Sequence, residues 1–176
     1  MRQRLLISAS EIDRRVKELA RVISSDYAGR EPVVVGILKG AFIFMADLVR
    51  ELDMPIEVEF VACESYHSGT ASSGQVKLTR DVGVPIAGRH VLLIEDIVDS
   101  GRTTDFLLGH LKAKGAASVR LCVLLDKPSR RVVPVTIDYL AFSVPDHFLV
   151  GYGLDVDQRF RNLPAVFSVE VSADGP

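Results

Sequence analysis

The sequence predicts an α/β fold in which a mostly parallel, twisted sheet is flanked by helices. Runs of β-branched and aliphatic residues alternate with segments whose apolar residues recur at helical spacing, an order typical of βαβ units. Most strand-like runs are apolar at almost every position, as in strands buried on both faces. The 176 residues suit a single domain, residues 1–176, because no repeat, linker or low-complexity segment divides the chain.

The first half of the chain is expected to alternate between helix and strand. Ser8 and Glu11 have capping-box spacing, and the apolar residues after them recur at helical intervals, which predicts a helix over about residues 9–27. A strand (PVVVGILKG, 32–40), a helix (AFIFMADLVREL, 41–52) and a second strand (PIEVEFVACESY, 55–66) follow.

Residues 65–80, SYHSGTASSGQVKLTR, interrupt this alternation. They are rich in Ser, Gly and Thr and show no apolar period before Val76. A polar loop of this length in a compact domain is usually either a mobile lid or disordered, and composition alone leaves both readings open.

The second half of the chain resumes the alternation. Gly115 lies where a glycine commonly ends a helix, so we expect a helix over residues 103–115. The expected strands are HVLLIEDI (90–97), SVRLCVLLDK (118–127), IDYLAFSV (137–144) and HFLVGYGL (147–154).

The composition excludes several classes of protein. Hydrophobic residues make up 48% of the chain, which is enough for a real core, and a formal net charge of −2 argues against duplex nucleic acid as a partner. No apolar run reaches the roughly 18 residues of a membrane span, and residues 1–30 lack a signal-peptide core. Cys63 and Cys122 lie in apolar runs without metal-site or disulfide spacing, which favours two reduced core thiols. We therefore expect a cytoplasmic protein that binds neither nucleic acid nor membrane.

Three acids follow the aliphatic run in VLLIEDIVDSGRTT, residues 91–104. Ligands of such sheets gather beyond the carboxyl ends of the strands. A structural explanation is that Asp99 or Ser100 caps the next helix. That explanation leaves Glu95 and Asp96 without a role, and neighbouring carboxylates usually meet a cation or ligand hydroxyls.

The end of the same segment has the chemistry of an anion site. Gly101 allows a close backbone approach, and the hydroxyls of Ser100, Thr103 and Thr104 join the amides of a helix N-terminus, which bind phosphate well. Acids beside a phosphate site fit a sugar phosphate. The P-loop and GxGxxG patterns are absent from the chain.

VLLIEDIVDSGRTT resembles the phosphoribosyl-pyrophosphate signature of type I phosphoribosyltransferases. Four other segments resemble those of bacterial hypoxanthine-guanine phosphoribosyltransferases, so that the resemblance covers about residues 10–168. The segments are LKGAFIFMADL, ESYHSGT with GQVKL, LLDKPSRR, and VPDHFLVGYGLDVDQRFRNLP. The resemblance implies the type I phosphoribosyltransferase fold, with a small hood formed by the N- and C-terminal segments.

The resemblance also implies an activity. The phosphoribosyl group of 5-phosphoribosyl 1-pyrophosphate would pass to N9 of hypoxanthine or guanine, giving IMP or GMP and pyrophosphate, with Mg²⁺ as cofactor. Residues 65–80, with Ser65 and Tyr66 at their root, would be a mobile loop that excludes water from the reacting centre. A homodimer or homotetramer is implied as well.

Individual roles follow from the resemblance. Glu95 and Asp96 would bind the ribose hydroxyls, directly or through Mg²⁺, and Asp155 would be a second metal ligand. Asp99 would be the general acid or base at purine N7. The 5′-phosphate would be held by Ser100, Gly101, Arg102, Thr103 and Thr104.

The remaining roles concern pyrophosphate and the base. Lys127 would donate to the oxygen at purine C6, which selects 6-oxopurines over adenine. Taken without the resemblance, Lys39 reads as a surface lysine and Phe148 as a core aromatic residue. With it, Lys39, Gly40 and Arg161 would bind pyrophosphate, Phe148 would stack on the base, and the backbone near Leu149 would read the edge of the base.

Two rival functions stay open. A regulator of the same fold would bind nucleotides and RNA or repress purine genes, and an RNA-binding form would need a basic surface patch. A transferase that prefers xanthine and guanine would differ only in its contacts at purine C2. A response-regulator phosphoacceptor site is disfavoured because its acids would come from separate strands.

Overall fold

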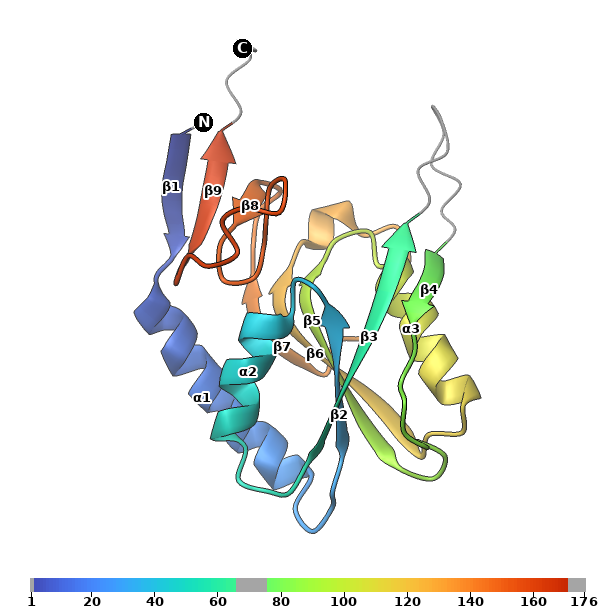
Figure 1. Cartoon of the computed structure of the whole chain (residues 1–176). Coiled ribbons are helices and arrows are strands. Elements are labelled where there is room, and N and C mark those ends of the chain that lie inside the picture. Colours follow the sequence, from blue (N-terminus) through green and yellow to red (C-terminus); the bar gives the residue numbers. More distant parts are fainter. Residues whose placement is uncertain (1, 66–75, 171–176) are drawn as a thin grey trace.

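The computed structural model describes residues 2–65 and 76–170 and contains two sheets (Figure 1). The larger sheet has the strand order β4-β3-β2-β5-β6-β7. Neighbouring strands pair in parallel except β4, which is antiparallel to β3. The predicted mostly parallel sheet is therefore confirmed. Its strands are β2 (Val33–Leu38), β3 (Glu57–Ser65), β4 (Val76–Arg80), β5 (His90–Val98), β6 (Ser118–Asp126) and β7 (Tyr139–Ser143).

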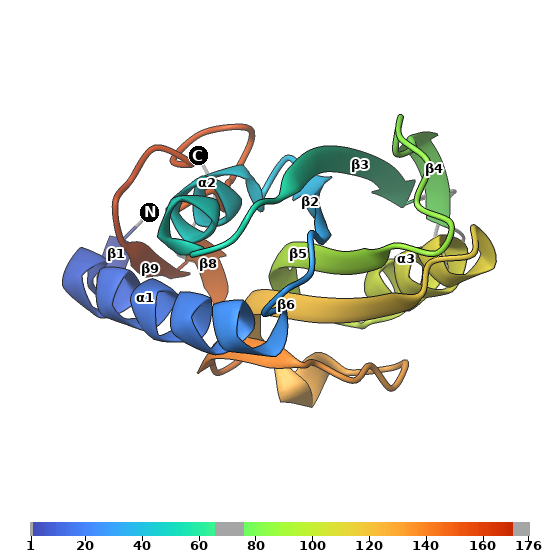
Figure 2. The same ribbon diagram turned by 90° about the horizontal axis from the view of Figure 1, so that it is seen from below.

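Helices cover both faces of the larger sheet. Figure 2 shows α1 (Ala9–Asp26) and α2 (Phe42–Glu51) on one side and α3 (Arg102–Ala113) on the other. A short 3₁₀ helix, η1 (Pro128–Arg130), follows β6. The predicted capping box opens α1, because Ser8 and Glu11 each accept a hydrogen bond from the backbone amide of the other. Within the described part of the chain, no helix has the length and apolarity of a bilayer span.

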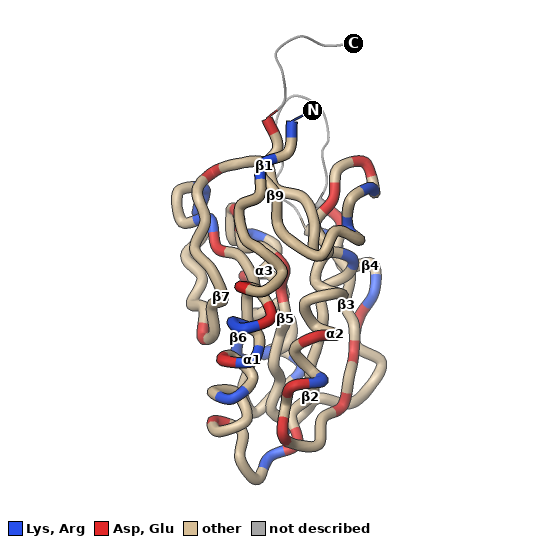
Figure 3. The backbone as a smooth tube through the Cα atoms, turned by 90° about the vertical axis from the view of Figure 1, so that its left-hand side faces the viewer, with Lys and Arg blue, Asp and Glu red and all other residues tan. Residues whose placement is uncertain are grey.

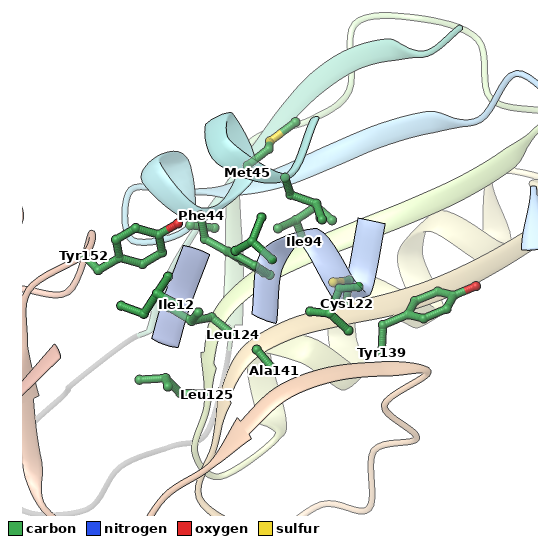
Figure 4. Close-up of a cluster of buried hydrophobic side chains, with 14 of the residues drawn as sticks. Ile12, Phe44, Met45, Ile94, Cys122, Leu124, Leu125, Tyr139, Ala141 and Tyr152 are labelled. Atoms are coloured by element: carbon green, nitrogen blue, oxygen red, sulfur yellow. The ribbon is translucent and has the colours of Figure 1, made fainter. Parts of the chain in front are cut away.

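The core lies on both faces of the sheet. In β5, Leu92 belongs to the cluster under α1 and α2, and Leu93 belongs to the cluster under α3. Successive strand residues point to opposite faces, which explains why the apolar run is continuous. Figure 4 shows Ile12 of α1 and Phe44 of α2 in the first cluster, which also contains Cys122 of β6. Each such side chain contributes roughly 1.5–3 kcal/mol through burial.

The smaller sheet joins the two ends of the described chain. It has the order β1-β9-β8, from β1 (Arg2–Ile7), β8 (Phe148–Val150) and β9 (Val166–Glu170), and all its pairings are antiparallel. Figure 1 shows it beside the carboxyl-terminal ends of the parallel strands. This is the expected hood, although no strand was predicted within residues 2–7 or 166–170.

The expected loop over residues 65–80 is too long at its C-terminal end. Residues 76–80 form β4, in which Val76 pairs with Ser65 and Leu78 with Cys63. Leu78 also packs against the core on the α3 face, so this alternating stretch gains its strand from tertiary contacts. Residues 66–75, with Tyr66, lie outside the described residues, as does the side chain of Ser65, and the lid remains a prediction.

Candidate active site

The two adjacent acids lie inside β5, which continues to Val98. Glu95 is buried, with 6% of its surface exposed, and it accepts a hydrogen bond from Thr104 Oγ1 of α3 at 3.4 Å. Asp96 faces the start of α2, where a Cβ atom on Gly40 would lie 1.8 Å from Asp96 Oδ2. The carboxylate of Asp96 and the backbone of Gly40 can be this close only because Gly40 has no side chain.

Burial perturbs both carboxyl groups. Loss of solvent, followed by the charge of Asp96, raises the pKa of Glu95 well above its usual value. Burial likewise raises the pKa of Asp96. Two adjacent carboxyls in this setting resist carrying two negative charges unless a cation or ligand hydroxyls compensate them. The pair therefore has the electrostatics of a binding site rather than of a structural cap.

The turn after β5 is held against the segment that follows η1. The amides of Val132 and Val133 donate to Ser100 O at 2.9 and 3.0 Å. Gly101 has φ of +84°, and a Cβ atom on it would lie 2.5 Å from Val133 O. Glycine is needed here for its conformation and for the close approach.

Gly101 is the N-cap of α3 and has no side chain to cap it, so the capping explanation for Asp99 or Ser100 is wrong. The Ser100 hydroxyl reaches only the amide of Arg102, at 3.4 Å. The amides in the first turn of a helix lack intrahelical partners. The start of α3 can therefore offer amides to a phosphate. Thr103 lies in the first turn of α3, and the side chain of Arg102 is exposed.

A cavity of about 500 Å³ lies beside this turn. Phe148 has 49% of its surface exposed, so the reading of Phe148 as a core residue is wrong. Lys127 follows β6 and is buried, and its amide donates to Val98 O at 3.0 Å. Six predicted site residues line the cavity, namely Asp96, Asp99, Lys127, Phe148, Leu149 and Asp155, together with Ile97, Arg130, Asp146, His147 and Leu154.

The predicted pyrophosphate residues form a neighbouring group. The peptide bond between Leu38 and Lys39 is cis. Gly40 follows this bond. Asp96 packs against one side of Gly40 and Gly153 against the other, and a Cβ atom on Gly153 would lie 2.0 Å from Gly40 O. The turn after β2 is therefore packed between β5 and the chain that follows β8.

Two cations of this group share one neutral acceptor. Lys39 Nζ and Arg161 Nη2 each donate to Gln158 Oε1 at 3.2 Å. Arg161 also donates to Gly153 O at 2.7 Å and forms an ion pair with Asp155 at 2.7 Å. Lys39 and Arg161, 122 positions apart by their residue numbers, therefore meet at Gln158, and this pair of cations lies outside the turn after β5.

Arg130, Asp146 and Gln158 also lie at the candidate site, and the sequence did not predict them. Arg130 Nε donates to Asp99 Oδ1 at 3.1 Å, and Asp146 lies 3.6 Å from Arg130 Nη1 and 3.7 Å from Lys127 Nζ. Arg130 and Asp146 could have been found from their place in the sequence. They lie within three residues of Lys127 and Phe148, in the two segments that the resemblance assigns to base binding.

The carboxylates also bear on metal binding. In the described ranges, no three His, Cys, Asp or Glu side chains cluster as a ready-made metal site. Asp96 and Asp155 line the same cavity and Glu95 does not. Mg²⁺ is commonly held by one or two carboxylates with substrate phosphates and water, and the oxygen donors of Asp96 and Asp155 fit that pattern.

Comparison with known proteins places the chain among relatives of one kind. Residues 8–157 match the model of the phosphoribosyl transferase domain. The chain is 48% identical over 164 residues to the hypoxanthine-guanine phosphoribosyltransferase of Streptococcus pneumoniae, covering 93% of this chain and 91% of that protein. It is equally similar to the bifunctional TilS/HprT protein of Listeria innocua, of whose length it spans 25%.

Solved structures agree with this assignment. A hypoxanthine-guanine phosphoribosyltransferase from Bacillus anthracis superposes with a TM-score of 0.91 at 43% identity, covering 95% of this chain and 98% of that one. A hypoxanthine phosphoribosyltransferase from Staphylococcus aureus also gives a TM-score of 0.91, at 38% identity, covering 95% and 91% of the two chains.

Proposed function

This chain belongs to the phosphoribosyltransferase family, and on that premise we propose that it serves purine salvage as an enzyme of the hypoxanthine-guanine type. It transfers the phosphoribosyl group of 5-phosphoribosyl 1-pyrophosphate to N9 of hypoxanthine or guanine, giving IMP or GMP and pyrophosphate. The observation that carries the proposal is the cavity beside the turn after β5, where Asp99, the buried Lys127 and the half-exposed Phe148 meet.

Each end of the substrate has a candidate binding group. The amides and hydroxyls of residues 100–104 hold the 5′-phosphate, helped by the positive end of the α3 dipole. The ribose hydroxyls face the acids of β5. Lys39, Gly40 and Arg161 hold the pyrophosphate, for which the meeting of Lys39 and Arg161 at Gln158 is the support.

The base is selected and activated by side chains of the cavity. Phe148 offers an exposed ring for stacking, the backbone near Leu149 reads the edge of the base, and Lys127 donates to the oxygen at purine C6. In the reaction the bond between N9 and C1′ forms while the bond between C1′ and the pyrophosphate oxygen breaks. Asp99 accepts the proton that leaves N7, a contribution typically worth ~10²–10⁴-fold in rate.

Mg²⁺ fits this site as a cofactor. Asp96 and Asp155 would hold it, and Glu95, within β5, would be the third carboxylate of the set. When bound, Mg²⁺ neutralises the charge of the departing pyrophosphate. We further propose a cytoplasmic homodimer or homotetramer built from one domain of residues 1–176, with the predicted lid at Ser65 and Tyr66.

The rival functions have weaker support. Figure 3 shows acidic and basic residues mixed along the described chain, whereas an RNA-binding regulator needs its basic residues gathered in a patch. A transferase that prefers xanthine and guanine would differ only in its contacts at purine C2, whereas the similar Streptococcus pneumoniae protein is a hypoxanthine-guanine phosphoribosyltransferase.

The test is nucleotide formation from 5-phosphoribosyl 1-pyrophosphate and Mg²⁺ with hypoxanthine, guanine, xanthine, adenine and uracil in separate reactions. We expect turnover of hypoxanthine and guanine and none of adenine or uracil. Fastest turnover of xanthine would replace the proposal by the xanthine-preferring enzyme. If no base reacts, the regulator becomes the better explanation.

A further inference from the structure

Asp99, which lines the cavity, is held by two consecutive arginines, Arg130 and Arg131. Arg130 Nε donates to its carboxylate, at Oδ1, over 3.1 Å, and Arg131 Nε donates to its backbone carbonyl over 3.3 Å. Arg131 is fixed in turn by an ion pair with Asp126, at the end of β6. The carboxylate and the backbone of Asp99 are thus both oriented by a segment that lies 31 residues further along the chain.

The position of Arg130 is itself built into the fold. Arg130 ends η1, and its amide donates to Lys127 O at 3.1 Å. Asp146 lies 3.6 Å from Arg130 Nη1 and 3.7 Å from Lys127 Nζ. The four charges therefore alternate in sign in the order Asp99, Arg130, Asp146 and Lys127, and the two ends of this row are the groups proposed to face purine N7 and the oxygen at C6.

We infer that Arg130 is a positioning residue for Asp99, and that Asp146 holds Arg130 in place. Arg130 donates to Oδ1, which leaves the second carboxylate oxygen to accept the proton at N7. A carboxylate whose rotation is unrestrained meets that proton less often in a productive geometry, and small misplacements of a catalytic group are costly. This inference rests on the proposed function, because it concerns the proton transfer assigned to Asp99.

A plain surface ion pair is the alternative. The side chains of Arg130 and Asp99 are 54% and 44% exposed, and exposed pairs contribute little to stability. The two readings differ in what they predict. A surface pair is dispensable to the reaction, whereas a positioning residue acts on the rate through Asp99 and through no other group.

The experiment is a double-mutant cycle with hypoxanthine as the base. Arg130→Ala is measured with and without Asp99→Asn, and Arg14→Ala is the matched control because Arg14 forms an exposed ion pair with Glu18 on α1, away from the cavity. We expect Arg130→Ala to lower kcat about tenfold, with the KM for 5-phosphoribosyl 1-pyrophosphate within about twofold of the wild type. In the presence of Asp99→Asn, Arg130→Ala should cause no further loss.

Chemical rescue separates positioning from damage to the fold. Millimolar guanidinium should restore part of the kcat of Arg130→Ala and leave Arg14→Ala unchanged, because the Arg130 site is open to solvent. Arg130→Lys should retain more activity than Arg130→Ala, and Asp146→Asn should show a smaller loss of the same kind.

Three results would overturn the inference. They are an unchanged or increased kcat for Arg130→Ala, losses of Arg130→Ala and Asp99→Asn that multiply in the double variant, and a loss seen only in KM. Absence of transfer by the wild-type protein would instead remove the proposed function, so the two failures are distinguishable.

Discussion

Substitution of Gly101 by alanine tests whether the turn after β5 depends on its close contact with the segment after η1. Two costs are expected. Gly101 has φ of +84°, a left-handed conformation that costs an L residue roughly 1–2 kcal/mol. The new Cβ atom would lie 2.5 Å from Val133 O, and overpacking of this kind costs typically about 1–3 kcal/mol. Together Gly101→Ala should lower the free energy of unfolding by roughly 2–5 kcal/mol.

Gly88→Ala is the matched control. Gly88 has φ of +71°, and a Cβ atom on it would meet nothing within 4 Å apart from its own chain neighbours, so Gly88→Ala bears the conformational cost alone, about 1–2 kcal/mol. Urea unfolding of both variants isolates the contact as a difference of about 1–3 kcal/mol. Gly101→Ala should also raise the KM for 5-phosphoribosyl 1-pyrophosphate by about tenfold or more, while Gly88→Ala leaves that KM unchanged. Equal destabilisation by the two substitutions would refute the reasoning.

Three other predictions concern single side chains. Glu95→Gln should raise the free energy of unfolding of the metal-free protein at pH 7 on the order of 1 kcal/mol. The sign follows because the folded state raises the pKa of Glu95. The contribution of Glu95 to the free energy of folding is therefore fully present below the ordinary carboxyl pKa, and it is lost as the pH rises through the raised pKa. Urea unfolding from pH 5 to 8 should therefore show a weaker decline with pH in Glu95→Gln than in the wild type, and an equal decline would contradict the assignment. Burial raises the pKa of Cys63 to about 11. At pH 8 only about one Cys63 side chain in a thousand is therefore ionised to the reactive thiolate. A colorimetric thiol assay should show slow reaction of Cys63 and, until urea is added, none of the fully buried Cys122, whereas fast labelling of the native protein would refute this. Lys127→Ala should raise the KM for hypoxanthine by about tenfold or more through loss of a charged hydrogen bond, and an unchanged KM would remove Lys127 from base recognition.

Local patterns predicted much of the fold because their causes are local. The capping box of Ser8 and Glu11 fixes the start of α1, and the continuous apolar run of residues 33–38 is enough to indicate β2 as a strand buried on both faces. The strand β1 was missed because its sequence, RQRLLI, gains its conformation from pairing with residues 166–170 near the other end of the chain. The strand β4 was missed for the same reason, since its partner is β3 across residues 66–75.

The candidate site divides in a similar way. The segment of residues 95–104 could be singled out from the sequence because its acids, glycine and hydroxyls lie close together in the chain. The contacts of Arg130 with Asp99, and of Lys39 and Arg161 with Gln158, join residues that are far apart in the chain. No periodicity or spacing predicts such pairs, because they depend on how η1 and the chain after β8 lie against β5.

The most direct measurement of the central claim is the kcat for hypoxanthine in the wild type and in Asp99→Asn, each with its KM for 5-phosphoribosyl 1-pyrophosphate. Asparagine keeps the size of the side chain but cannot accept the N7 proton. The account predicts active wild-type protein and a kcat at least about a hundredfold lower in Asp99→Asn, with little change in that KM. Equal kcat values in the two proteins would contradict the role of Asp99.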